Sequence, residues 1–225
     1  MEQYVITAIH YDKKNKNKLI LYINDEPGPS IHEDIWINYR LTQGTIINSD
    51  LLEEIEKSAL QYDAYIAAIR YLGRKACTSK QLQNYLLRKE FSESDSVYAV
   101  ERLTKEKILD DLQYAKQYAE SKLRNNKKGR NFILQQLQAI GIKKELAQEA
   151  VATLDLDNEN EAALYAAEKK WPHITGDHRK RQYKLQQFLL RRGFPAGMVY
   201  QIMKMDQFRI NEQELFEEDG HMLDN

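Results

Sequence analysis

Residues 109–142 read LDDLQYAKQYAESKLRNNKKGRNFILQQLQAIGI, and this stretch decides how the rest of the chain is interpreted. Asp110 is expected to cap a helix, because a short carboxylate accepts hydrogen bonds from first-turn N–H groups that lack a partner within the helix. Asp111 directly follows it, and two adjacent carboxylates diverge on a helix, so a structural role is expected for both. Apolar residues then recur at three- and four-residue steps, which predicts one buried stripe: Leu112, Ala115, Ala119 and Leu123.

The second half of this stretch predicts a basic turn and another helix. Lys127, Lys128, Gly129 and Arg130 break the apolar pattern with positive charge and a flexible residue. Gly141 is expected to end the following helix in the left-handed conformation that glycine adopts readily. The residues expected to face the core of that helix are Ile133, Leu134, Leu137 and Ile140.

The apolar pattern of this stretch recurs on both sides of it. The corresponding residues are Leu82, Leu86 and Phe91, then Ile133, Leu137 and Ile142, then Leu185, Leu189 and Phe194. Three repeats of about fifty residues, each about three helices, are the simplest interpretation, and chance matching of apolar residues is the alternative. One repeat alone would expose an apolar face, so the repeats are expected to stack into an elongated, curved array.

Residues 1–48 predict a small α+β module in front of the repeats. Residues 3–11 and 18–24 are rich in β-branched and aromatic side chains and predict a β-hairpin. Pro27, Gly28 and Pro29 are expected to end it, with Ser30 capping a helix. A short strand is expected around Ile46.

The fold class expected is therefore mainly α: three tandem three-helix repeats preceded by an α+β module made of a β-hairpin and a helix. Ser49 and Ser79 are expected to cap helices in the first repeat, and residues 182–192 are expected to form a helix of the third. The expected segments are the module 1–48, repeats 49–108, 109–157 and 158–210, and a flexible acidic tail 211–225.

Composition places the chain among soluble proteins. Hydrophobic residues make up 42% and charged residues 30% of the 225 positions, and Gly and Pro are scarce, at 9 and 4. The single Cys77 cannot form an internal disulfide, and no apolar run approaches the roughly 20 residues of a membrane span. We expect a cytoplasmic protein without a membrane segment.

Positive charge gathers in the second and third repeats, although the net charge is only −1. The two clusters are Arg124, Lys127, Lys128 and Arg130, and then Arg179, Lys180, Arg181, Lys184, Arg191 and Arg192. Both occupy similar positions in their repeats, so stacking would place them along one surface. Such a surface attracts phosphate, through its charge and through the helix N-terminus that each cluster opens. A solvated helix face is the alternative.

The sequence shows no recognisable catalytic, metal-binding or cofactor-binding motif. His173, Asp177 and His178 resemble loose metal ligands, but no fourth ligand follows at a familiar spacing. The chain has no phosphate-binding loop and no dinucleotide fingerprint. We expect no catalytic residue, no metal site and no cofactor, and most of the fourteen tyrosines are expected to pack in cores or interfaces.

The motif residues resemble the middle repeat of the bacterial RecX regulatory proteins. They are Leu109-Asp110-Asp111, Tyr114-Ala115, Lys128-Gly129-Arg130, Leu137 and Gly141-Ile142. The helix at 68–72 and the residues Ser79-Lys80-Gln81-Leu82 are similar to the first repeat of that family, and the third repeat fits more loosely. The resemblance covers roughly residues 60–205, and the first module resembles the extension of RecX-like proteins of Gram-positive type.

The resemblance implies a non-enzymatic regulator, expected to be a monomer, that binds the RecA recombinase filament. It implies modulation, mostly inhibition, of ATPase activity, strand exchange and filament growth, with roles in homologous recombination, DNA repair and the SOS response. The basic residues named above are then the expected contacts with the filament or DNA, and the structural motif is Asp110, Asp111, Gly129, Leu137 and Gly141. Single- or double-stranded DNA stays open as a second partner. The alternative functions are a stand-alone DNA-binding helical repeat protein and a general interaction scaffold.

Overall fold

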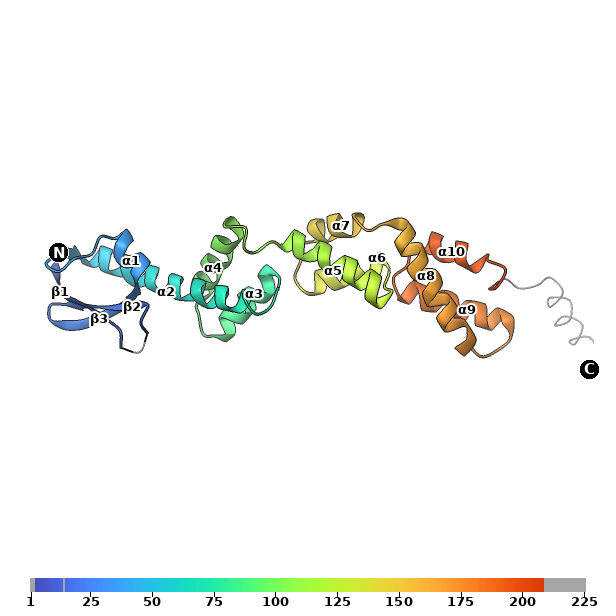
Figure 1. Ribbon diagram of the computed structural model, residues 1–225, viewed down its shortest axis with the longest axis horizontal. Helices are drawn as coiled ribbons and strands as arrows, with labels where there is room; N and C mark the ends of the chain where they lie inside the picture. Colours follow the sequence, from blue (N-terminus) through green and yellow to red (C-terminus); the bar gives the residue numbers. More distant parts are fainter. Residues whose placement is uncertain (1–2, 14, 209–225) are drawn as a thin grey trace, which may run out of the picture. The chain divides into compact units, whose positions relative to one another are not determined.

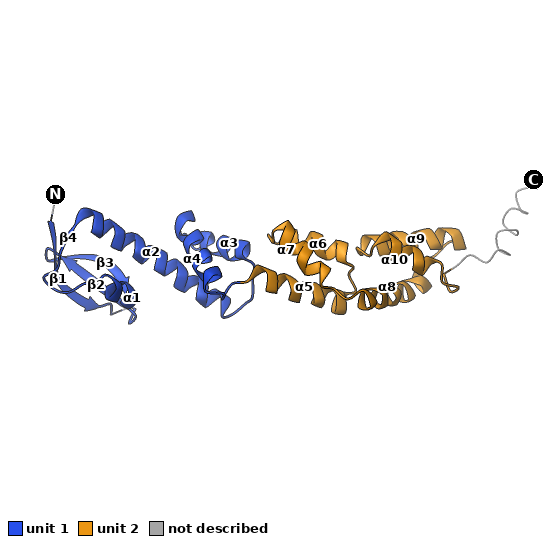
Figure 2. Ribbon diagram, turned by 90° about the horizontal axis from the view of Figure 1, so that it is seen from above, with its two compact units in different colours: residues 1–109 blue, residues 110–225 orange. Residues whose placement is uncertain are grey.

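The computed structural model describes residues 3–13 and 15–208, and the chain divides into two compact units, Met1–Leu109 and Asp110–Asn225 (Figure 2). In the described part there are ten α-helices, one short 3-10 helix and four β-strands. The expected fold class is confirmed: the chain is mainly helical, with a small antiparallel sheet at the start of the first unit. The acidic tail expected at 211–225 lies outside the described residues.

The sheet of the first unit has the strand order β3-β2-β1-β4, and each neighbouring pair is antiparallel. The bounds are β1 Gln3–Tyr11, β2 Lys18–Ile23, β3 Glu26–His32 and β4 Ile46–Asn48. The expected hairpin is present as β1 and β2, with Ile9 opposite Leu21. Alternate residues of β2 turn to the core, as the twofold side-chain period of a strand requires.

Pro27, Gly28 and Pro29 were expected to end the hairpin, but the sheet continues through them in a third strand, so this prediction was wrong. They lie within β3, where Pro27 is opposite Tyr22 of β2. Proline lacks an N–H and breaks a ladder in the middle of a sheet, but β3 is an edge strand, where proline is tolerated because one side of the strand has no partner strand. The helix therefore begins later than expected, as α1 Glu33–Asn38 after His32, and Ser30 is a strand residue.

The long helix α2, Ser49–Leu72, serves two cores. Its first half contributes Ile55 and Ala59 to the core beneath the sheet, and its second half contributes Ala64 and Ala68 to the core of the first repeat. Figure 1 shows α2 running from the sheet to the other helices of that repeat. The cap is Asn48, whose side chain accepts a hydrogen bond from the Leu51 N–H, rather than Ser49.

The first repeat is completed by α3 Ser79–Arg88 and α4 Glu93–Lys105. The cap of α3 is Thr78 and not Ser79, which corrects the sequence prediction by one residue. The Thr78 hydroxyl accepts from the Gln81 N–H at 3.1 Å, while the Gln81 side chain accepts from the Thr78 N–H at 3.2 Å. This reciprocal pair satisfies two N–H groups at once, which a lone serine at the next position does not do.

The second unit holds the other two repeats around one continuous core. The helices are α5 Asp111–Asn126, α6 Arg130–Ala139 and α7 Lys144–Ala152, then α8 Leu156–Lys170, the 3-10 turn η1 Trp171–His173, α9 His178–Arg191 and α10 Ala196–Met203. Leu137 of α6 and Leu185 of α9 are both fully buried in this core. Helix α9 begins four residues before the expected position 182, because the Asp177 carboxylate accepts from the Lys180 N–H at 2.7 Å and starts it there.

None of the helices in the described ranges 3–13 and 15–208 combines the length and apolar character of a membrane span.

His32 lies in a charged contact between the sheet and α2. It is 7% exposed, and its Nε2 is 3.2 Å from Asp63 of α2, whose other carboxylate oxygen is 2.6 Å from the Lys18 ammonium. Burial lowers the pKa of His32 and Lys18 lowers it further, while Asp63 and Asp34 act in the opposite direction. Burial prevails, so the folded unit favours neutral His32, which then acts as a hydrogen-bond donor to Asp63.

The first unit should therefore lose stability in mild acid. The unfolded chain binds the His32 proton at about pH 6.5, before the folded chain does, so the His32 contribution is complete above that pH and is lost below it. His32→Gln keeps a neutral donor and should flatten the decrease of the urea midpoint between about pH 7.5 and 5.5. Trp36 fluorescence in a Trp171→Phe background measures it, and an unchanged pH profile would contradict this assignment.

Candidate functional site

The basic residues of the third repeat that were singled out in the sequence are divided between the two ends of α9. Arg179, Lys180, Arg181 and Lys184 lie in its first two turns. Arg192 follows its last residue, and its Nη1 donates to the main-chain oxygens of Asn126 and Lys127, at 2.9 Å each. The 14 residues of α9 span about 20 Å, so only the second end meets the basic turn between α5 and α6.

The cations at the first end of α9 bind the main chain and side chains of the segment that precedes the helix. Arg181 donates to the main-chain oxygen of Trp171 at 3.3 Å, and its guanidinium lies 4.3 Å from the centre of a Trp171 ring. Lys184 donates to the Thr175 carbonyl at 2.8 Å, and the Lys180 ammonium is 2.6 Å from Asp177. Arg179 is exposed on the same helix. Much of this charge therefore has local partners.

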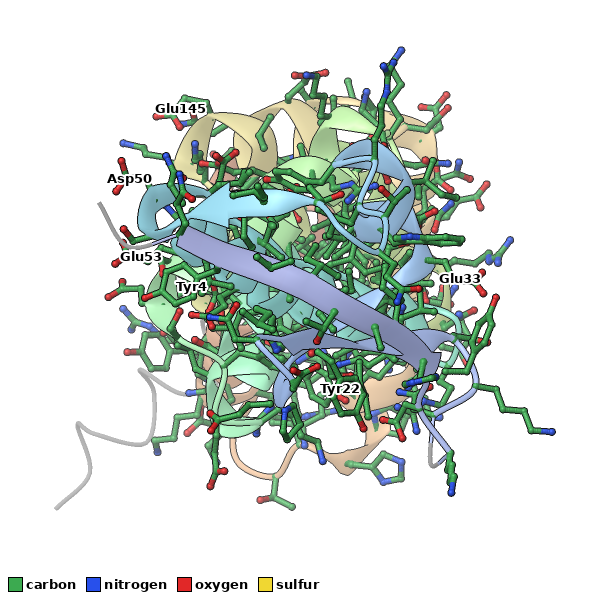
Figure 3. All side chains as sticks on the ribbon, turned by 90° about the vertical axis from the view of Figure 1, so that its left-hand side faces the viewer. Tyr4, Tyr22, Glu33, Asp50, Glu53 and Glu145 are labelled. Atoms are coloured by element: carbon green, nitrogen blue, oxygen red, sulfur yellow. The ribbon has the colours of Figure 1, made fainter. Side chains whose placement is uncertain are left out.

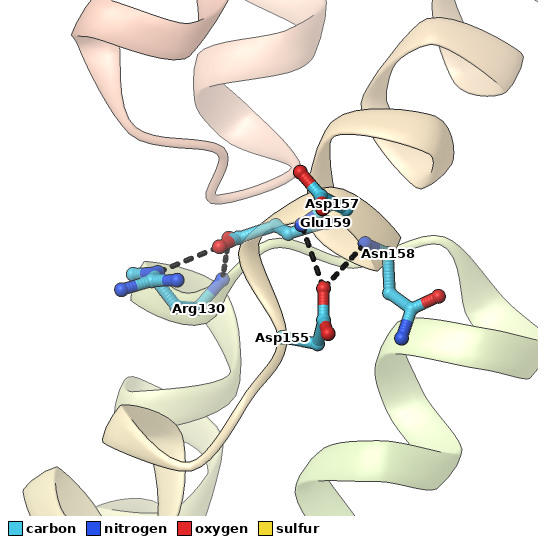
Figure 4. A network of polar contacts seen from close by, with 5 residues as sticks. All are labelled: Arg130, Asp155, Asp157, Asn158 and Glu159. Carbon is cyan, nitrogen blue, oxygen red and sulfur yellow. Dashed lines mark hydrogen bonds and ion pairs between the residues drawn. The ribbon is translucent and has the colours of Figure 1, made fainter.

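Arg130 is bound to a carboxylate that the sequence did not single out. Glu159 of α8 is fully buried, and it accepts from the Arg130 main-chain N–H at 2.8 Å and from Arg130 Nε at 2.6 Å (Figure 4). Asp155 starts α8 by accepting from the Asp157 and Asn158 N–H groups, which places Glu159 one turn later. In the sequence Glu159 is one acid among several, and no local pattern marks it as buried.

Two glycines bring the turns of the second and third repeats into main-chain contact. The Gly129 N–H donates to the Arg192 carbonyl at 2.9 Å, and the Asn131 N–H donates to the Gly193 carbonyl at 3.0 Å. A Cβ on Gly129 would lie 2.4 Å from Gly193 O, and one on Gly193, whose φ is +88°, would lie 2.2 Å from Phe132 N. Only glycine fits at either position.

This contact changes the expected role of the α6 N-terminus. The N–H groups of Gly129, Arg130 and Asn131 are used by the end of α9 and by Glu159. The positive end of α6 thus faces the negative end of α9, a favourable arrangement of helix dipoles. The sequence suggested that these N–H groups would attract phosphate, and the structure shows that they are already bonded within the protein.

The other motif residues have structural positions. Asp110 accepts from the Gln113 N–H at 2.9 Å, and Asp111 is the first residue of α5. Gly141 has a φ of +94° after the end of α6, and Leu137 is fully buried.

Lys128 lies among cations. Burial lowers the pKa of Lys128 most, and the positive charges of Arg192 and Lys122 lower it further. Its ammonium lies 4.1 Å from the centre of the Phe132 ring. An anion placed here would relieve the repulsion among these cations.

A groove of 540 Å³ opens where α5, α8 and α9 meet, and we call it the junction groove. It is lined by Asn125, Asn126, Lys127, Tyr165, Ala166, Lys169, Lys170, His173, Phe188 and Arg192. This lining contains no carboxylate. A larger neighbouring groove of 730 Å³ does contain acids, because Glu120, Asp155 and Glu161 line it beside Arg124 and Lys127.

The sequence predicted two residues of the junction groove, Lys127 and Arg192. It did not single out Lys169 and Lys170, which end α8, or the aromatic pair Tyr165 and Phe188. The sequence does hold a signal for these residues, because Lys169, at the basic end of α8, follows the aromatic Tyr165 by four residues. Arg191 is exposed at the end of α9 but does not line this groove.

Several acidic side chains lie at the sheet end of the first unit. Figure 3 views this end, and the carboxylates of Glu33, Asp50 and Glu53 lie around its rim. All three side chains are exposed: Glu33 lies in α1, and Asp50 and Glu53 lie in α2. Within the described ranges, no cluster of three or more His, Cys, Asp and Glu side chains is arranged to hold a metal ion.

Comparison with known proteins matches three consecutive family models to this chain. The first, second and third three-helix domains of RecX match residues 64–103, 110–151 and 157–203, which together make up more than half of the chain. These matches correspond to the three expected repeats.

Curated relatives extend the similarity to nearly the whole chain. A regulatory protein RecX from Oceanobacillus iheyensis is 28% identical over 227 residues, covering 97% of this chain and 84% of the relative. One from Enterococcus faecalis is 27% identical, with the same two coverages. A crystal structure of a regulatory protein RecX has a TM-score of 0.78 at 23% identity, covering 90% of this chain and all of the other, which supports the fold.

Gly193→Ala should destabilise the second unit by about 2–4 kcal/mol, because alanine costs about 1–2 kcal/mol in the left-handed region and its Cβ overlaps Phe132. Gly197→Ala is the matched control. Its Cβ meets nothing within 4 Å and it lies in α10, so that change should stabilise by up to about 1 kcal/mol. Urea unfolding followed by Trp171 fluorescence measures both, and equal effects of the two changes would refute the close contact.

Proposed function

The chain belongs to the RecX family of regulatory proteins, and from this premise we propose that it binds the RecA recombinase filament and lowers its activity. The chain acts by binding, with no reaction of its own and no cofactor. It works as a monomer in the cytoplasm, and its proposed domains are the module 1–48 and the repeats 49–108, 109–157 and 158–210.

The distribution of positive charge is the observation that supports this proposal. The basic turn of the second repeat and the end of α9 bring Lys122, Lys128 and Arg192 together. Burial lowers the pKa of Lys128 most, and the two neighbouring positive charges lower it further. Neighbouring like charges disfavour each other's charged forms, and an anion bound beside them offsets this cost. A filament of recombinase on DNA is a large polyanion, and it supplies the missing negative charge.

The contacts with the filament include Lys127, Lys128, Arg191 and Arg192 around the junction, with Arg124 beside them. Arg179, exposed at the start of α9, and Lys180, whose ammonium is also paired with Asp177, make a second contact. Arg130, Arg181 and Lys184 contribute charge but keep their partners within the protein.

Regulation follows from differential binding. A ligand shifts the equilibrium between filament states only by binding them with different free energies. A protein that binds a shortened or stalled filament better than a growing one lowers ATP hydrolysis, strand exchange and filament extension together. Electrostatic attraction brings it to the filament and weakens as salt is added.

The second candidate function is a stand-alone DNA-binding protein that affects recombination by competing for DNA. The carboxylate-free lining of the junction groove favours it, because phosphate is the ligand such a lining suits. The two candidates differ in stoichiometry. A filament regulator acts when DNA is in excess, whereas a competitor acts only when it covers the DNA.

DNA-dependent ATP hydrolysis by the cognate RecA, with DNA in excess, tests the proposal. We expect strong inhibition at far less than one molecule of this protein per recombinase. An effect that begins only when the DNA is saturated would refute filament regulation and support the competitor.

Lys128→Gln should raise the concentration for half inhibition by about threefold or more, because it removes a partly buried cation from the junction. Lys144→Gln, an equal change of charge at the exposed start of α7, is its control and should leave inhibition unchanged. If both variants inhibit like the native chain, the basic junction does not contact the filament.

A further inference from the structure

We propose that the acidic tail, residues 211–225, binds a groove between α9 and α10 of its own chain. The bound tail covers Arg179, and it therefore competes with any anionic partner for the start of α9. The binding of the tail does not depend on the proposed function, whereas its effect on RecA rests on that function.

The groove lies where α9 and α10 pack side by side in the second unit (Figure 2), and we call it the α9–α10 groove. Its volume is 490 Å³, and its lining consists of Arg179, Gln182, Tyr183, Gln186, Tyr200, Met203 and Lys204. This lining holds two cations and no carboxylate. Neither cation forms an ion pair with another residue of the described ranges 3–13 and 15–208, so a carboxylate is the complementary group.

Two tyrosine rings give the groove an aromatic surface that the described chain leaves open. Tyr183 is 64% exposed and Tyr200 is 59% exposed. The Lys204 ammonium lies 4.3 Å from the centre of the Tyr200 ring, so positive charge and apolar surface are adjacent. The groove therefore suits a peptide that combines carboxylates with bulky apolar side chains, because such a peptide uses both features at once.

The described part of the chain ends beside this groove. Phe208 is its last residue and is buried, and the Phe208 carbonyl accepts from Gln182 Nε2 at 2.9 Å. The same nitrogen donates to the Met203 carbonyl at 3.4 Å. Gln182 and Met203 both line the groove, so the chain that follows Phe208 begins next to it.

The sequence of the tail complements the lining of the groove. The tail contains no Lys or Arg, and its acids are Glu212, Glu214, Glu217, Glu218, Asp219 and Asp224. Leu215 and Phe216 stand together in the middle of these acids. The stretch 214–218 thus carries two bulky apolar side chains for the tyrosines and flanking carboxylates for Arg179 and Lys204.

The connection from Phe208 is long enough for this stretch to reach the groove. An extended chain from residue 208 to residue 215 spans about 23 Å. The groove residues of α9, from Arg179 to Gln186, extend over about 10 Å of helix. A segment tethered in this way has an effective concentration in the millimolar range, so even a weak contact is occupied. The tail of a second copy has the same chemistry but lacks the tether.

The test is paramagnetic broadening of amide signals in the full chain, without RecA and without DNA. A nitroxide is attached through Gly220→Cys, and the added thiol reacts selectively because Cys77 is buried. The amide signals of Tyr183 and Tyr200 should lose most of their intensity. The signal of Trp171 should lose less, because Trp171 also packs against Phe208 but does not line the groove.

Variants of the groove and of the tail separate binding from mere proximity. Arg179→Gln/Lys204→Gln should reduce the broadening at Tyr200 about threefold, because two exposed ion pairs with the tail are lost. Lys143→Gln/Lys144→Gln is the matched control, since it removes the same charge from exposed positions of the same unit, and it should leave the broadening unchanged. Leu215→Ser/Phe216→Ser should also reduce the broadening, and it alters no residue of the described structure.

Three results would overturn the inference. The first is equal broadening at Trp171 and Tyr200, and the second is an equal effect of the groove pair and its matched control. The third comes from a mixture of spin-labelled chain and isotope-labelled chain without nitroxide. Broadening between the two molecules as strong as that within one would mean that the tail of a second copy occupies the groove.

The effect on RecA is tested separately. Leu215→Ser/Phe216→Ser should lower the concentration for half inhibition about threefold, because the tail no longer competes with the filament for Arg179. Groove-dependent broadening with unchanged inhibition would uphold the inference and refute the filament contact assigned to Arg179. Stronger inhibition by this variant, without groove-dependent broadening in the parent chain, would overturn the inference and leave the proposed function intact.

Discussion

The direct main-chain contact between Gly129 and Gly193 is the constraint on which the second unit depends. It joins the end of α9 to the start of α6 through two hydrogen bonds, and Glu159 takes the N–H between them. A buried carboxylate is costly unless it is fully paired, and here it receives two donors from Arg130. The second and third repeats are therefore fixed to each other by polar contacts as well as by their shared apolar core.

This contact also determines which basic side chains are engaged within the protein and which are not. Arg130 is occupied by Glu159, and one guanidinium nitrogen of Arg192 is occupied by the end of α5. The same geometry holds Lys122, Lys128 and Arg192 close together, where they repel one another. This repulsion lowers the stability of the free protein, and an anion bound there would offset the loss. In the proposed function, the turn that fixes the two repeats to each other also contacts the filament.

Local patterns in the sequence were sufficient for most of the helical fold. Asp110 marks the start of α5 and Gly141 marks the end of α6, because caps and left-handed stops act within one turn of chain. The edge position of β3 was not predictable in this way, since whether prolines are tolerated depends on which strand lies beside them. Glu159 and the junction groove were missed for the same reason: they arise from contacts between residues 29 or more positions apart.

Native-state hydrogen exchange tests the coupling of the two repeats most directly. Mass spectrometry under increasing denaturant gives the opening free energy of α6, residues 130–139, and of α9, residues 178–191. If the Gly129–Gly193 contact makes one cooperative unit, both helices will open with the same free energy and the same dependence on denaturant. Clearly lower protection of α9, with α6 still closed, would contradict it and show that the third repeat unfolds alone.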